Sequence, residues 1–144
     1  MSKKHLAQIN IAQMKAAKDH PIMKEFVDFL DPVNKLADES PGFIWRLVGE
    51  PDEPSPWNDM VIINMSVWEN IETLKDFTYN TAHSYFVRSR KKWFQHLGTP
   101  HYVMWWVDEG HVPTLAEAAE KLDSLNNNGP TKKAFTFAKP FQPI

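Results

Sequence analysis

Cysteine is absent from this chain of 144 residues, and glycine is scarce, with 5 residues. Without cysteine the protein has no disulfides, no thiolate metal ligands and no cysteine nucleophile. The few glycines form no P-loop, no G-x-G-x-x-G and no G-x-S-x-G pattern. These patterns mark phosphate sites, dinucleotide sites and the serine nucleophile of α/β-hydrolases. Their absence argues against all three classes of enzyme.

Long apolar runs and an excess of one charge are lacking as well. No stretch approaches the roughly 20 apolar residues of a membrane-spanning helix, and residues 1–20 lack the apolar centre of a signal peptide. The formal net charge of -2 gives no reason to expect a nucleic-acid partner. The six histidines are dispersed, without a second histidine or an acidic residue at metal-ligand spacing. We therefore expect a cytoplasmic protein with no metal, no membrane and no nucleic acid.

Aromatic residues are what the chain does contain. They make up 12% of the sequence, with 6 tryptophans, and hydrophobic residues make up 42%. Such a composition is too apolar for a disordered chain, and its length allows one domain over residues 1–144 with a real core. An indole N–H needs a partner when it is buried. Several tryptophans in a small domain therefore indicate either an interface or ligand wall, or a plain core, with equal weight.

The hydrophobic patterns predict an α+β fold. Strands are expected at residues 5–12, 43–48, 60–67 and 101–107. Helices are expected from residue 20 to 36 and from 68 to 97, the second with a break near residues 79–81. Pro32 should break or kink the first helix. A further helix capped by Thr114 and a short strand at 134–137 close the chain. The order β-α-β-β-α-β up to residue 107 is that of a ferredoxin-like sheet with helices on one face.

The strand at 101–107 is apolar on both faces, which predicts cover on both sides of the sheet. The two faces carry Val103, Trp105 and Val107 on one side and Tyr102, Met104 and Trp106 on the other. Two helices would cover one face, and a second copy stacked sheet to sheet would cover the other. We therefore expect a homodimer. The alternative is that the last helix folds across the open face alone.

Two polar residues interrupt the apolar stripe of the helical region 68–97. The stripe, at alternating spacings of four and three, consists of Tyr79, His83, Phe86, Arg90, Trp93 and Leu97. An inward cation is costly unless it is paired or faces a wet cavity. This helix face therefore either holds a buried polar network or lines a pocket.

Each residue of this helix that could carry chemistry also has a structural explanation. His83 could act as base, acid or ligand, or it could be a core histidine bonded to a backbone carbonyl. Arg90 could hold a carboxylate or phosphate, or it could form a structural ion pair. Trp93 and Trp105 could form the aromatic wall of the pocket, although such residues are more often plain core.

Further candidates lie outside that helix. His111 and Thr114 precede a helix N-terminus, which attracts anions, although turn geometry and capping explain both residues. Asn10 and Gln8 share one face of the first strand, where inward amides either need partners or point at the cavity. Arg46 could face the same cavity or solvent.

A family resemblance covers nearly the whole chain. It is carried by H-L-A-Q-x-N-I-A from residue 5, G-F-x-W-R-L from 42, W-E-x-I-E-x-L-x-x-F from 68, A-H at 82, R-x-R-K-x-W-F from 88, W-W-V-x-x-G-H-x-P-T-x-x-E-A from 105, and G-P-T-x-x-A-F-T-F from 129. These segments resemble a bacterial domain-of-unknown-function family, number thirty-two ninety-one of that series. The resemblance implies a dimeric α/β barrel, similar to the antibiotic-biosynthesis monooxygenase group, and it implies no known activity.

These observations lead to an expected function. The first interpretation is a small-molecule enzyme, monooxygenase-like or isomerase-like and without a cofactor, acting on a hydrophobic or aromatic ligand beside His83 and Arg90. Haem is the alternative, because haem-degrading members of the broader barrel group place their axial histidine on the corresponding helix, which would be His83 here. The third interpretation is a dimer that binds a small molecule without catalysis.

Overall fold

The computed structural model describes residues 3–17, 19–48, 56–57, 60–80, 92–95 and 101–143. His83 and Arg90 lie outside these residues. In chain order the elements are β1 (Lys4–Gln13), a 3-10 turn η1 (Pro21–Met23), α1 (Lys24–Asp38), β2 (Phe43–Arg46), β3 (Val61–Trp68), α2 (Ile71–Asn80), β4 (Tyr102–Asp108) and α4 (Leu115–Asn128). The predicted α+β class and the order of its elements are confirmed.

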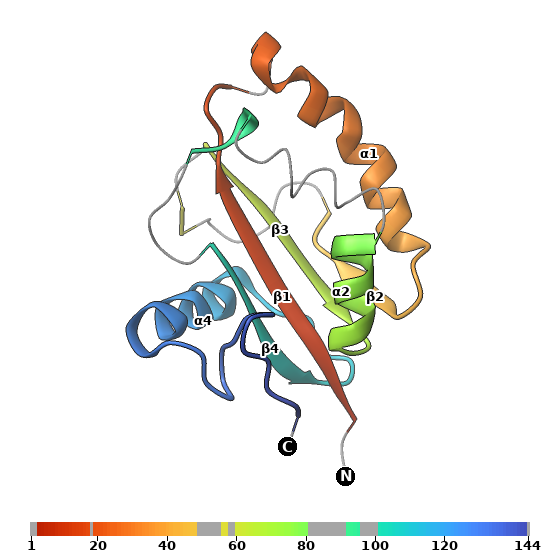
Figure 1. The fold of residues 1–144 in the computed structure, drawn as a ribbon, viewed down its shortest axis with the longest axis vertical. Helices are drawn as coiled ribbons and strands as arrows, with labels where there is room; N and C mark the ends of the chain where they lie inside the picture. The colour runs from red at the N-terminus through yellow and green to blue at the C-terminus, as the bar shows by residue number, and fades with distance from the viewer. Residues whose placement is uncertain are drawn as a thin grey trace.

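The four strands form one antiparallel sheet in the order β2-β3-β1-β4 (Figure 1). The strands β1 and β3 are therefore central; β1 is largely buried, whereas β3 is buried from Met65 to Trp68. In this pair Gln8 lies opposite Ser66, and Asn10 lies opposite Asn64. Since side chains alternate along a strand, all four of these residues point to the same face of the sheet.

Helices cover both faces of the sheet, as Figure 1 shows with α1 and α2 on one side and α4 on the other. On the first face, Val33 of α1 and Leu74 of α2 share a buried cluster with Leu6 of β1. On the second face, Leu115 and its neighbours on α4 pack against β1 and β4 in another buried cluster. Two apolar layers therefore enclose the sheet.

The doubly apolar strand β4 is covered on both sides within a single chain. Trp105 packs on the α4 side, whereas Met104 packs on the side of α1 and α2. The short C-terminal strand expected at 134–137 is present as one bridge, with two backbone hydrogen bonds of 2.8 and 2.9 Å between Met104 and Phe135. The homodimer stays a prediction with a weaker motive, and sedimentation at micromolar concentration tests it.

The expected break at Pro32 is wrong, because α1 continues through this residue to Asp38. Proline removes one helical hydrogen bond and leaves the carbonyl of Asp28 without its usual donor. Pro32 is exposed on the outer face of the helix, where water can hydrate that carbonyl. The buried residues Phe26, Val33 and Ala37 hold the opposite face on the sheet, so packing overrides the local signal.

Within the described residues, no helix combines the length and the apolar character that crossing a membrane requires.

Candidate functional site

A cavity of about 280 Å³ lies between the sheet and the two helices α1 and α2. Its floor comes from the central strands β1 and β3, and its walls come from α1, α2, the start of β4 and Phe137 of the C-terminal segment. Ligand sites of α+β proteins are commonly concave and mostly apolar, with a few polar groups that orient the ligand. This cavity has that character.

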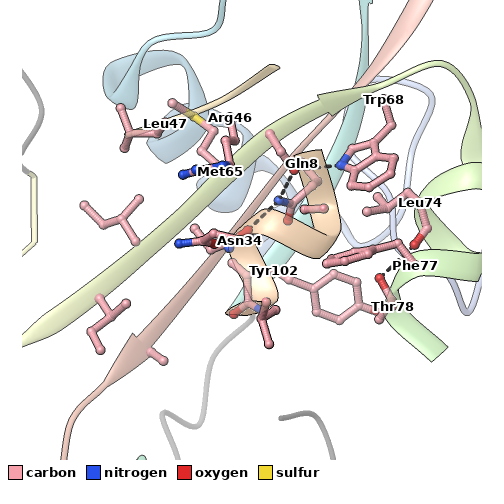
Figure 2. Close-up of a pocket in the computed structure, with 18 of the residues that line it drawn as sticks. Gln8, Asn34, Arg46, Leu47, Met65, Trp68, Leu74, Phe77, Thr78 and Tyr102 are labelled. Carbon is pink, nitrogen blue, oxygen red and sulfur yellow. Dashed lines mark hydrogen bonds between the residues drawn. The ribbon is translucent and has the colours of Figure 1, made fainter. Parts of the chain in front are cut away.

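The floor of the cavity carries four polar side chains, which we call the amide block: Gln8, Asn10, Asn64 and Ser66. They occupy the middle of two central strands whose flanking positions on this face are apolar, as at Ala12. Figure 2 shows Gln8 in the centre of the cavity face. A sheet face that served only as core would carry apolar residues here, because buried polar groups are costly without partners.

Internal hydrogen bonds hold part of the amide block in place. The amide nitrogen Nε2 of Gln8 lies 2.8 Å from Oδ1 of Asn64 and 2.7 Å from Oγ of Ser66. The indole N–H of Trp68 donates to the same hydroxyl oxygen over 2.8 Å. Gln8 and Ser66 are 8% and 6% exposed, so the bond between them is buried. Asn64 is exposed, and its bond with Gln8 is only partly buried. A buried hydrogen bond is stronger than one in water, so it fixes Gln8 and Ser66 in place.

Two amides of the lining lack such bonds within the described part of the chain. Among the described residues, the side-chain amides of Asn10 and Asn34 make no hydrogen bond, and both residues are half-buried. Asn10 lies on the floor, and Asn34 projects from α1 on the opposite side. An amide offers two donors and two acceptor sites. Within the described residues, these two amides therefore keep hydrogen-bonding groups available for water or a ligand.

Aromatic rings form much of the wall. Trp68 and Phe77 stack with ring centres 5.2 Å apart, and Phe43 meets Trp68 edge to face at 5.4 Å. Tyr102 lies on the other side, beside Phe137 at 6.1 Å. Burial is the main reason that the pKa of the Tyr102 hydroxyl is raised, so this phenol stays neutral at physiological pH. The wall therefore suits an apolar, flat ligand.

One permanent charge lies at the rim, and it is compensated. The guanidinium of Arg46 contacts both carboxylate oxygens of Asp38 at the end of α1, over 2.7 and 3.3 Å. This hydrogen bonding lowers the pKa of Asp38, so the pair stays charged at neutral pH. Arg46 is the only Lys, Arg, Asp or Glu among the described lining residues. That part of the lining therefore presents no unbalanced charge to a ligand.

Comparisons with known proteins identify the family. The model of the family described as "Domain of unknown function (DUF3291)" matches residues 5–144. The chain belongs to this family. A crystal structure of the NE2512 protein of unknown function from Nitrosomonas europaea is similar, with a TM-score of 0.51 and 10% identity, over 79% of this chain and 97% of that one. At this identity the likeness shows the fold alone. None of the curated proteins matches the chain.

The structure places the predicted site residues of this DUF3291 chain in different layers. Asn10 lines the cavity, as does its neighbour Gln8. Trp93 is 1% exposed and packs against Phe26 and Phe94 behind the wall, without lining the cavity itself. The roles expected for these residues stay predictions.

Trp105 and His111 lie away from the cavity, on the side of α4. The indole N–H of Trp105 donates to Oε2 of Glu117 over 2.7 Å, and Nε2 of His111 lies 2.7 Å from Oε1 of the same carboxylate. Trp93 and Trp105 therefore do not form a common wall, because β4 points Trp105 to the opposite face of the sheet. Thr114 caps α4 as predicted and accepts a hydrogen bond from the backbone N–H of Glu117 over 3.1 Å.

Glu117 links this cluster to the pH dependence of stability. Burial raises the pKa of its carboxyl, but hydrogen bonds from His111 and Trp105 outweigh burial, so the net shift is downward. A pKa that is lower in the folded state stabilises the fold above the ordinary value and loses that effect as the pH falls.

We expect Glu117→Gln to lower stability at neutral pH by about 1 kcal/mol, a modest loss because the carboxylate is only partly buried and is screened by solvent. The difference from the parent should shrink as the pH falls below about 4.5, the ordinary glutamate value. Urea unfolding at a series of pH values measures it. Glu120→Gln, an exposed site on the same helix, is the control. A gap that stays constant with pH would contradict the assignment.

Sequence reasoning missed part of the amide block. It identified Gln8 and Asn10 but not Asn64 or Ser66, and it also missed Asn34 on α1. The signal was present in β3, where Asn64 and Ser66 alternate with Met65 and Val67. Alternation alone does not say whether the polar face meets solvent or a cavity, since a surface strand shows the same pattern.

Proposed function

We propose that this DUF3291 protein binds a small, uncharged, mostly apolar molecule in the cavity between the sheet and α1 and α2. We propose further that it acts on this molecule as a monooxygenase-like or isomerase-like enzyme without a resident cofactor. The observation that carries the proposal is the amide block, a polar floor in a cavity with aromatic walls.

The energetics of the amide block support a binding role. Replacing it with apolar side chains would add buried apolar area and remove the cost of dehydrating amides. Asn10 and Asn34 make no hydrogen bond with the described residues to offset that cost. Polar groups that reduce stability and face a cavity are typical of functional sites.

The catalytic roles proposed for His83 and Arg90 are supported by the residues that flank their segment. Tyr79 precedes this segment and Phe94 follows it, and both residues line the cavity. In this proposal His83 transfers a proton and Arg90 holds an oxygen atom that becomes negatively charged. Trp93 supports the adjacent wall through its contact with Phe94.

The fold that we propose is a ferredoxin-like unit of a dimeric α/β barrel. Its support is the strand order β2-β3-β1-β4 with α1 and α2 on one face. In this chain α4 occupies much of the other face, so a partner copy would have to pack beside that helix.

The binding proposal is tested with N-phenyl-α-naphthylamine, an uncharged dye whose fluorescence rises in apolar surroundings. We expect the protein to bind the dye, and Asn34→Trp to weaken binding by about tenfold or more, because the indole would fill the cavity from α1. Asn34 has no described hydrogen bond to lose, so the melting temperature should stay near that of the parent. Asn126→Trp, an exposed site on α4, makes the same change outside the cavity and should bind normally.

Two results would contradict this proposal. Equal dye binding by the parent and Asn34→Trp would show that the dye binds elsewhere. A haem absorption band in the purified protein that disappears in His83→Ala would favour the alternative function, a haem protein with His83 as axial ligand.

A further inference from the structure

We propose that the amide block recognises a carbonyl oxygen, so that the natural ligand is an uncharged, largely apolar ketone, quinone, lactone or related carbonyl compound. This inference rests on the proposed function, because it assumes that the cavity is the ligand site. It adds which chemical group of the ligand the polar floor of the cavity would bind.

The inference rests on the number of donor hydrogens around Oγ of Ser66. The indole nitrogen of Trp68 is a donor only, so Oγ of Ser66 must accept along that 2.8 Å bond. In the arrangement drawn in Figure 2, Nε2 of Gln8 donates to Ser66 as well. The hydroxyl oxygen then accepts twice, and its own hydrogen is left without a described acceptor.

The opposite orientation of the Gln8 amide gives the same outcome. Amide oxygen and nitrogen are assigned from their surroundings, so both orientations are considered. If Oε1 of Gln8 takes the place of Nε2, it accepts from Ser66 and from the amide of a likewise rotated Asn64. Both N–H groups of Gln8 are then left without an acceptor in this network. Either arrangement therefore leaves at least one donor hydrogen at the floor of the cavity.

Asn10 supplies a second source of donors next to the first. It lies directly opposite Asn64 and two residues along β1 from Gln8, on the same face of the sheet. Its amide has no described partner and lines the cavity. A ligand oxygen on this floor would therefore meet donors from two neighbouring positions, which a carbonyl with two lone pairs can use together.

The cost of dehydrating a charged group explains why this cavity should prefer a carbonyl over a carboxylate. Dehydrating a carboxylate is costly unless a cation or several donors compensate it. The floor itself holds only neutral side chains, and Asp38 already occupies the guanidinium of Arg46 at the rim through two contacts. The proposed function assigns Arg90 to an oxygen that becomes charged only during the reaction, so it does not select a charged ligand. A neutral carbonyl loses less hydration and uses the same donors, so this floor favours it.

The experiment compares three ligands of similar shape: α-tetralone, tetralin, which lacks the oxygen, and tetralin-α-carboxylate. Their affinities are measured by displacement of the dye N-phenyl-α-naphthylamine. We expect α-tetralone to bind about tenfold tighter than tetralin, the effect of one good hydrogen bond in a dry site, and the carboxylate to bind more weakly than the ketone. In spectra of the labelled protein, the indole N–H signal of Trp68 should shift with the ketone more than with tetralin.

Two variants test the assignment to the amide block. Asn10→Leu breaks no described hydrogen bond, so it should fold, and it should reduce the preference for the ketone while tetralin binding is kept or improved. Ser66→Ala should reduce the same preference, and Ser124→Ala on α4 is its control. Asn10→Leu keeps the test decisive if Ser66→Ala fails to fold, because Ser66 also supports Trp68.

The outcomes distinguish the two proposals. Equal affinity for ketone and tetralin, or a preference that both variants retain, would overturn the carbonyl inference and leave the binding proposal standing. Tighter binding of the carboxylate would overturn it as well. Failure of every ligand and of the dye to bind would overturn the proposed function, and this inference with it.

Discussion

Gly42→Ala should destabilise the protein by about 2–5 kcal/mol, although it adds only one methyl group. Gly42 has a backbone φ of +81°, a conformation that residues with a Cβ adopt only at a cost. A Cβ at this position would lie 2.6 Å from Cβ and 2.7 Å from Oγ1 of Thr73, with Cγ2 closer still. Both the backbone conformation and the contact oppose the substitution, so their costs add.

The position of Thr73 explains why this neighbour cannot move away easily. Thr73 and Asn70 form a reciprocal cap at the start of α2, with the backbone N–H of Thr73 donating to Oδ1 of Asn70 over 2.9 Å. The carbonyl of Gly42 also accepts from the backbone N–H of Glu69 over 2.7 Å. A shift of Thr73 would therefore disturb the beginning of α2, the helix that supplies Leu74 and Phe77 to the cavity wall.

Gly110→Ala is the matched control for this prediction. Gly110 has a similar φ of +89°, but a Cβ there would meet nothing within 4 Å. It should cost about 1–2 kcal/mol, the backbone contribution alone. Urea unfolding followed by circular dichroism measures both variants. Equal losses for the two glycines would show that the contact with Thr73 relaxes without cost.

Phe135→Ala should lower the free energy of unfolding by about 3–5 kcal/mol, as large-to-small substitutions of buried aromatic residues do. Phe135 is 0% exposed, and its ring packs near Trp106 and Phe141. Its backbone also forms the bridge to Met104 on β4. The substitution would leave a void in the buried cluster that Phe135 shares with Leu6 and Met104.

The stability of Phe135→Ala is compared with that of Phe29→Ala, which removes the same atoms from a ring that is 42% exposed on α1. Phe29→Ala should lower the free energy of unfolding far less, since less apolar area of this ring is buried. A small loss at Phe135 would mean that the C-terminal segment does not contribute to the core. Dye binding should weaken in parallel in this variant, because Phe137 of the same segment lines the cavity.

The chemical proposals depend on two separate parts of the molecule. Recognition is argued from the amide block on β1 and β3, whose contacts are described. Catalysis is argued from His83 and Arg90, which lie outside the described residues, and from their flanking residues Tyr79 and Phe94 at the cavity. The dye and tetralone experiments test recognition without assuming any reaction, so the binding proposal and the catalytic proposal are tested separately.

Local chemistry explains which elements were predictable. The alternation in β1, the cap formed by Thr114 and the apolar spacing of α4 act within a few residues, so the sequence shows them directly. Pro32 misled the prediction because its effect on α1 depends on which face of the helix meets solvent. That face is set by packing against the sheet, which acts over long separations along the chain.

By itself, the sequence determined the family, the α+β class, the order of the elements and the inward amides of β1. Only the tertiary structure decided that Asn64 and Ser66 complete the floor, that Trp105 lies on the other face, and that Glu117 joins Trp105 to His111. These contacts depend on how the strands pair and on which face of the sheet α4 packs. A residue's type and spacing fix what it can bind, whereas the pairing of β1 with β3 and β4 brings residues more than 50 positions apart into contact.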